Sequence, residues 1–273
     1  YYFNLSTDKE LLFTPTINYG GGVDASQRFT FDYNQVLSGG SFKSDLTFDS
    51  NFENENNNKW LSDASLITNY NKNINEKFRI SIDSALQTSK NYIQITKPND
   101  ELSYTNSLST NFNLEGFNLR KIDDQLNISL NFYQTNQENE DNKTIPTVLP
   151  KIKYFSGYKN NKDFIVSSNY EFYNIFREKG NDVHAKKQQK LSYNINVKKD
   201  LISLNSKLSF DTEVYSQGFN TEDILIDQNN YKTGTYLRIF PIIGISSETP
   251  FKLKNYITEL TFVPKFKLIL SPG

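Results

Sequence analysis

Apolar and polar residues alternate along most of this chain with a period of two. Phe29, Phe31 and Tyr33, for example, alternate with Thr30 and Asp32. Successive side chains of a β-strand point to opposite faces, so the pattern predicts strands with one apolar and one polar face. No segment shows a convincing helical period. The same alternation recurs over residues 42–52, 60–70, 78–82, 101–115, 126–132, 164–172, 191–197, 204–214, 237–241 and 260–268.

Polar turns separate these segments and fall into two classes. Long ones are predicted over 54–59, 136–143, 177–190 and 216–230, and short ones over 72–75 and 198–200. We count roughly fourteen strand candidates, and many are longer than the ~5–6 residues usual in soluble sheets. One edge of short turns and one of long loops is the layout of outer-membrane barrels.

The apolar face of such strands has two possible neighbours. A soluble sandwich would bury it against a second sheet, whereas a membrane barrel would expose it to lipid. Charges in mid-strand on the opposite face suit a wet lumen. Aromatic residues near strand ends resemble membrane girdles; they are Tyr19, Tyr33, Trp60, Tyr70, Tyr133 and Tyr173. We therefore predict an all-β, antiparallel up-and-down transmembrane β-barrel in the cell outer membrane.

Composition adds to this picture. Aromatic residues make up 14% of the 273 residues, yet the mean hydropathy is −0.62. The longest apolar run, 239–245, is far shorter than the ~20 residues of a membrane helix. The formal net charge is −1, so nucleic acid is not an implied partner. The chain starts with Tyr1 and has no methionine, so we expect a piece or a processed form of a longer protein.

The sequence gives no support for an enzyme or a cofactor site. It has no cysteine and a single histidine, His184, which argues against thiolate and histidine metal sites, a cysteine nucleophile and Ser-His-Asp chemistry. Neighbouring carboxylates, such as Asp123 with Asp124 and Glu138 with Glu140, fall in predicted turns. We expect them to be solvated loop charges rather than an acid–base pair.

Three ordered motifs carry a more specific signal. The opening stretch Tyr1–Pro15 contains Tyr-Tyr-Phe-Asn and ends in Phe-Thr-Pro, and a Gly-rich turn (20–22) and the pair Arg28-Phe29 follow it. Leu149-Pro150-Lys151-Ile152 is the second motif. The third comprises 234–241, Thr249-Pro250 and 262–265. In this order they resemble the lipopolysaccharide (LPS)-assembly protein family of the outer membrane, the LptD family. That family often has a threonine at the position of Val263.

The resemblance implies the first part of a large barrel. The family has an N-terminal periplasmic jelly roll followed by a barrel of roughly 26 strands; residues 1–273 match the first half of that barrel, without the jelly roll and the closing strands. The implied function is insertion of LPS into the outer leaflet through a lateral gate. The implied partners are LPS, membrane lipid, a plug lipoprotein (LptE-like) and a periplasmic LPS bridge protein.

Six residues become site candidates. Pro15 falls inside the first predicted strand, where it either ends the strand or weakens a seam, because proline has no N–H for the ladder. The resemblance makes that seam the lateral gate. Five polar residues are expected to face the lumen, where they could line a sugar path or contact a plug: Lys43, Asp45, Asp49, Arg79 and Asp83.

Two other classes of protein remain open at this stage. A porin or receptor-type barrel shares the alternation but not the ordered motifs. A β-rich surface adhesin would stay monodisperse without detergent. Half a barrel would leave two open strand edges, which lipid does not tolerate, so we expect residues 1–273 alone not to insert stably.

Overall fold

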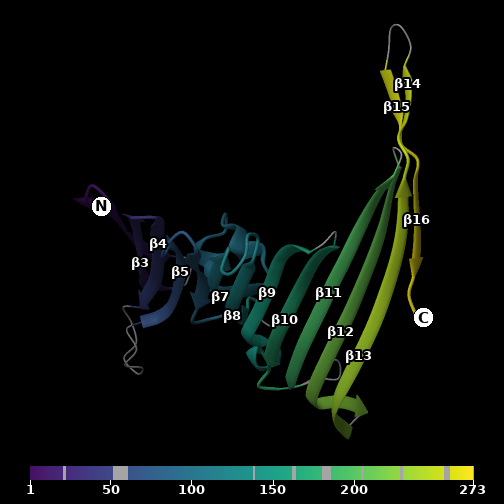
Figure 1. Ribbon diagram of the computed structural model, residues 1–273. Helices are drawn as coiled ribbons and strands as arrows, with labels where there is room; N and C mark the ends of the chain where they lie inside the picture. The colour runs from purple at the N-terminus through teal and green to yellow at the C-terminus, as the bar shows by residue number, and fades with distance from the viewer. Residues whose placement is uncertain are drawn as a thin grey trace.

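The structure is a computed structural model, and its main element is a single antiparallel sheet (Figure 1). It describes residues 1–20, 23–51, 61–137, 139–161, 164–179, 186–203, 206–227, 230–254 and 259–272. Trp60, Glu138 and His184 lie outside these residues, as does the side chain of Tyr19. No helix in the described part of the chain is both long and apolar enough to cross a membrane.

The sheet has 14 strands in an up-and-down order, each beside its neighbour in sequence, and its edge strands are β1 and β16. All the pairings are antiparallel, so the predicted all-β meander and the strand number are confirmed. The strands are β1 (Tyr2–Ser6), β2 (Lys9–Gly20), β3 (Val23–Leu37), β4 (Gly40–Asn51), β5 (Leu61–Asn73), β6 (Phe78–Gln87), β7 (Ser107–Phe117), β8 (Gln125–Thr135), β9 (Thr147–Asn161), β10 (Phe164–Phe176), β11 (Lys187–Ser203), β12 (Ser206–Asp227), β13 (Asn230–Glu248) and β16 (Lys265–Leu270).

A separate two-stranded hairpin follows β13. It consists of β14 (Phe251–Lys254) and β15 (Glu259–Phe262), and it extends beyond the end of the large sheet (Figure 1). The helical elements are short: α1 (Tyr92–Thr96), η1 (Glu101–Tyr104) and η2 (Asn142–Thr144). Segment 101–115 was predicted as one strand, but 101–104 is η1 and β7 starts only at Ser107. The Asp100 side chain accepts the N–H of Leu102 and thereby caps this turn.

The register gives the sheet one apolar and one polar face. Phe13 lies opposite Phe31, Phe31 opposite Leu46, and Leu46 opposite Leu66, so one row of apolar side chains crosses four strands. Further along, Ile152, Phe172 and Leu191 are aligned in the same way. Tyr133 and Tyr173, however, belong to the polar face, where Tyr133 is opposite Ser109 and Tyr173 opposite Lys151 and Lys190. Their assignment to a lipid-facing girdle was wrong.

No second layer covers the apolar face in the part of the chain that the structure describes. Leu191, Leu237 and Ile239 keep 57%, 73% and 60% of their surface exposed. The buried side chains there comprise four apolar and eleven polar residues, the reverse of a soluble domain, where burial favours apolar residues. The described residues therefore form no sandwich of two facing sheets.

The two ends of the sheet differ, as predicted. One end carries tight connections, such as Leu37 to Gly40 and Asn73 to Phe78, and we call it the tight-turn end. At the other, the long-loop end, β6 and β7 are joined by residues 88–106 and β8 and β9 by 136–146.

Two predicted turns are strand instead. Residues 216–227 belong to β12, which pairs with β13 up to Asp227 and Asn230. The backbone pairing of β12 with β13 does not depend on side-chain polarity, so it continues through this polar stretch. Lys198–Asp200 lies within β11, where Asp200 forms ion pairs with Lys198 (3.7 Å) and with Lys207 of β12 (3.0 Å). Charges paired on a polar face thus resembled a turn in the sequence.

Candidate functional site

The five residues predicted to face a lumen all lie on the polar face. Lys43, Asn69 and Asp83 are cross-strand neighbours on β4, β5 and β6. Asp45 and Asp49 share the face of Lys43 on β4, and Arg79 shares the face of Asp83 on β6. The structure therefore brings all five to one surface.

Ion pairs and hydrogen bonds connect these side chains to their neighbours. Arg28 of β3 binds Asp49 in two places, with Nε–Oδ1 and Nη2–Oδ2 distances of 2.7 and 2.9 Å. Asp83 accepts a hydrogen bond from Asn69 (3.0 Å), and Arg79 lies 4.0 Å from Glu115. Bidentate Arg–carboxylate pairs hold both groups in a fixed geometry, so the Arg28–Asp49 pair ties β3 to β4 on the polar face.

Asp45 has a like-charged neighbour and a cation from a distant segment. It lies directly opposite Asp32 of β3, an arrangement that destabilises a sheet unless the charges are compensated. The ammonium of Lys97 forms an ion pair with Asp45. Lys97 directly follows α1, between β6 and β7, so a long-loop segment reaches back onto the polar face.

We call residues 88–106 the inner segment, because they fold onto this face. α1 packs against β5, and Ile93 is completely buried in a cluster with Ala85 and Leu108. Ile67 packs at the margin of the same cluster. Ile67 and Ala85 are opposite each other in the sheet and take positions where the face is otherwise polar.

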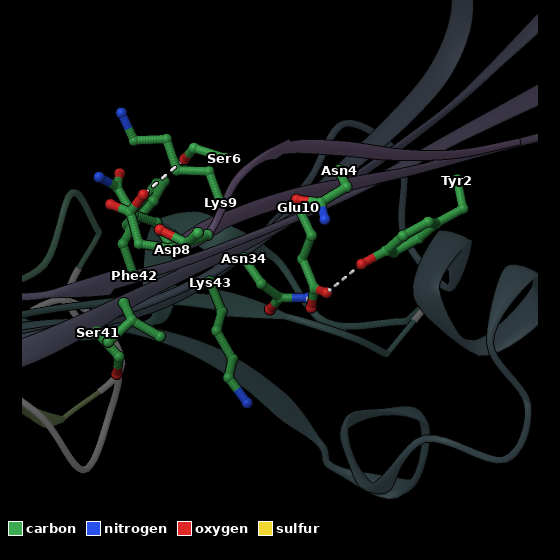
Figure 2. A pocket seen from close by; sticks show the side chains of 13 residues that line it. Tyr2, Asn4, Ser6, Asp8, Lys9, Glu10, Asn34, Ser41, Phe42 and Lys43 are labelled. Atoms are coloured by element: carbon green, nitrogen blue, oxygen red, sulfur yellow. Dashed lines mark hydrogen bonds between the residues drawn. The ribbon is translucent and has the colours of Figure 1, made fainter.

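Two contiguous hollows open on the same side of the sheet near its first strands. One, of about 380 Å³, lies at the β1–β2 turn, where Glu10 accepts hydrogen bonds from the Tyr2 hydroxyl (3.0 Å) and the Asn34 amide (3.1 Å) (Figure 2). The other, of about 450 Å³, is lined by Asp32, Asp45 and Asn69 among others. Both hollows include Lys43. The polar face is thus hollowed from the tight-turn end towards the inner segment.

Pro15 lies on an open edge of the sheet. Phe13 donates its N–H to the Tyr1 carbonyl (2.8 Å), so odd-numbered residues of β2 face β1. Backbone groups alternate in direction along a strand, and position 15 therefore also faces that side. β1 ends before this point, so no strand of the described chain pairs with β2 there, while Pro15 is aligned with Phe29 of β3. The proline does not end the strand, because β2 continues to Gly20.

Of the carboxylates considered for acid–base chemistry, Asp124 has a structural role. Asp124 is fully buried rather than solvated, and it accepts hydrogen bonds from the backbone N–H groups of Gly157 (2.6 Å) and Lys121 (3.0 Å) and from the Tyr154 hydroxyl (3.1 Å). Burial by itself would raise the pKa of Asp124, but these hydrogen bonds together hold its pKa below the ordinary value. Asp123 beside it is exposed, as predicted. Asp124 thus fastens the β7–β8 turn to β9.

No group of three or more potential metal ligands occurs among the residues that the structure describes. His184 and Glu138 lie outside them.

Sequence reasoning missed the inner segment and its contacts, including Tyr92 and Lys97. One signal was present. Ile67 and Ala85 interrupt otherwise polar positions in β5 and β6, and they indicate that something apolar covers the polar face at that point. No protein-family model matches the chain, and no curated protein matches it significantly.

Proposed function

We propose that this chain forms part of the wall of an outer-membrane β-barrel. The observation that carries the proposal is the uncovered apolar face of a 14-stranded meander whose other face is polar and ion-paired. Lipid is the neighbour that such an apolar face requires. The strands are also long enough, since about 9–11 tilted residues cross a bilayer and each strand from β2 to β13 has at least 10.

We propose LPS as the cargo. The support is the ordered set of motifs that resembles the LptD family, together with Pro15 on an open edge. An amphipathic cargo needs both a polar path for its sugars and a sideways exit for its acyl chains. A seam that lacks a backbone donor opens at lower cost, because each hydrogen bond contributes about 0.5–1.5 kcal/mol. The plug lipoprotein and the periplasmic bridge protein are proposed as partners on the resemblance alone.

The test is to replace Pro15 by valine in the full-length protein in its native cell. The new N–H lets the edge pair more firmly, so we expect less LPS at the cell surface and a more permeable outer membrane. Thr14→Val is the matched control, since its N–H faces β3 and adds no donor at the open edge. Equal surface LPS in the parent and the Pro15 variant would refute the gate.

A diffusion pore or receptor-type barrel is the second candidate, favoured by the inner segment. A loop that folds onto the polar wall is a means of restricting solute size, which a passive pore needs. Depletion of the full-length protein separates the two. Loss of surface LPS supports the translocon, whereas slower uptake of small hydrophilic solutes with normal LPS supports the pore. An adhesin predicts a monodisperse protein without detergent, and the uncovered apolar face predicts the opposite.

A further inference from the structure

The inner segment (residues 88–106) is the best-packed part of the polar face. The buried apolar side chains of the described chain are Ala85, Tyr92, Ile93 and Leu108, and all of them belong to this segment or to the ends of the strands that it joins. A long loop normally lies on the surface because its backbone groups need water. This one instead has a core of its own.

Hydrogen bonds fix the backbone of the segment from inside. The Gln87 side chain accepts the N–H of Ile93 (3.0 Å) and donates to the Asn136 side chain (3.0 Å). Asn136 in turn donates to the carbonyl of Thr105 (3.1 Å). Gln87 and Asn136 are only 6% and 5% exposed, so these bonds are shielded from water and link the segment to the end of β6 and to the start of the β8–β9 loop.

Contacts of charged side chains also attach the segment to the sheet. Lys97 pairs with Asp45 of β4, and only 16% and 28% of their side-chain surfaces are exposed. The Arg28 guanidinium, held by Asp49, lies 6.0 Å from the centre of the Tyr92 ring. On the far side, Lys90 donates to the carbonyl of Glu140 in the neighbouring long loop (2.6 Å). The segment is therefore held on β3, β4, β5 and β6 at once.

We infer that the inner segment is a fixed constriction, which narrows the hydrophilic passage along the polar face and excludes large hydrophilic solutes. Ordering a backbone costs conformational entropy at every residue, so an ordered loop of this length persists only when many contacts offset that cost. A hollow of about 450 Å³, lined in part by Asp45 and Ile67, lies beside the segment on the same face. This inference rests on the membrane barrel of the proposed function and does not depend on its cargo.

The test uses the full-length protein reconstituted in planar bilayers, with single-channel conductance and uptake of a large hydrophilic antibiotic as readouts. Lys97→Asp places a third carboxylate beside Asp32 and Asp45 and should release the segment. We expect a severalfold rise in both readouts. The double variant Asp45→Lys with Lys97→Asp restores an opposite-charge pair and should return both readouts towards the parent level.

Two further variants keep the test decisive. Lys77→Asp makes the same charge change in the exposed β5–β6 turn and should leave both readouts unchanged. Ala85→Cys with Ile93→Cys adds two thiols to a chain that has none, within one packed cluster, and the oxidised pair should block the effect of Lys97→Asp.

Heat-modifiable migration reports separately whether the barrel has inserted. An inserted barrel whose conductance and uptake are the same in the parent, in Lys97→Asp and after replacement of residues 92–104 by a short Gly-Ser linker would overturn the constriction. A parent protein that never inserts would refute the membrane barrel itself, and the constriction with it.

Discussion

Asp124 offers the sharpest test of how the fold is held together. Its carboxylate is completely buried and accepts hydrogen bonds from three backbone N–H groups and the Tyr154 hydroxyl. Asp124→Asn keeps the shape of the side chain but removes its charge. It also replaces one accepting oxygen by an amide N–H₂ group, which cannot accept the hydrogen bonds that the carboxylate received. A hydrogen bond to a charged group is worth about 1.5–3 kcal/mol and such terms are not additive, so we expect a loss of about 2–4 kcal/mol.

The assay is denaturant unfolding of the full-length protein in lipid vesicles, compared with Asp123→Asn. That control makes the same chemical change one residue earlier, at an exposed side chain whose left-handed backbone (φ 69°) asparagine also tolerates. We expect it to unfold like the parent. Equal unfolding midpoints for the Asp123 and Asp124 variants would refute the role of the buried carboxylate.

The same group predicts a pH dependence. The folded-state pKa of Asp124 is lowered, so its stabilising contribution is fully present above the ordinary aspartate value of about 3.9. That contribution is lost as the pH falls through the folded-state pKa. The difference between the parent and Asp124→Asn should therefore be constant from pH 7 down to about pH 5 and shrink in stronger acid. A difference that is already gone at pH 6 would contradict the assignment.

Two further pairs of substitutions test the turn and the faces. A Cβ at Gly157 would lie 2.2 Å from the Ile122 carbonyl oxygen, so Gly157→Ala should cost about 1–3 kcal/mol in unfolding free energy, whereas Gly218→Ala, with open space around it, should be neutral or slightly stabilising. Leu114→Arg on the apolar face should cost about 2–4 kcal/mol in vesicle unfolding experiments, while Asn113→Arg on the polar face should be tolerated; equal costs would refute the lipid-facing assignment.

The alternation of side chains predicted the meander and the two faces of its strands, although it assigned 101–104 to a strand and missed that 216–227 continues β12. In a meander each strand pairs with its neighbour, so one apolar and one polar parity per strand fix the register once the turns are known. The polar positions Lys43 and Asp83 met on one surface for this reason, although 40 residues separate them in the sequence. Charged residues that form ion pairs within the sheet suggested a turn where the strand continues, as at Lys198–Asp200.

The inner segment could not be predicted in the same way. Its apolar residues, such as Tyr92 and Ile93, follow no period because they pack onto a sheet rather than within one. The pairing of Lys97 with Asp45 spans 52 residues, and no periodic pattern of side chains connects the two positions. Only the apolar pair Ile67 and Ala85 under the segment left a trace in the sequence.

The proposed gate and the proposed constriction lie close together but are mechanically separate. All the anchors of the inner segment that we identified lie on β3 to β7 or in the neighbouring long loop, and Arg28 pairs inward with Asp49, away from the open edge of β2. Opening of the sheet edge at Pro15 therefore breaks none of these anchoring contacts. Lys97→Asp should then raise solute uptake without reducing surface LPS, and Pro15→Val should reduce surface LPS without raising conductance in planar bilayers. If each substitution changed surface LPS and solute passage to the same extent, the gate and the constriction would be coupled through β3 rather than mechanically separate.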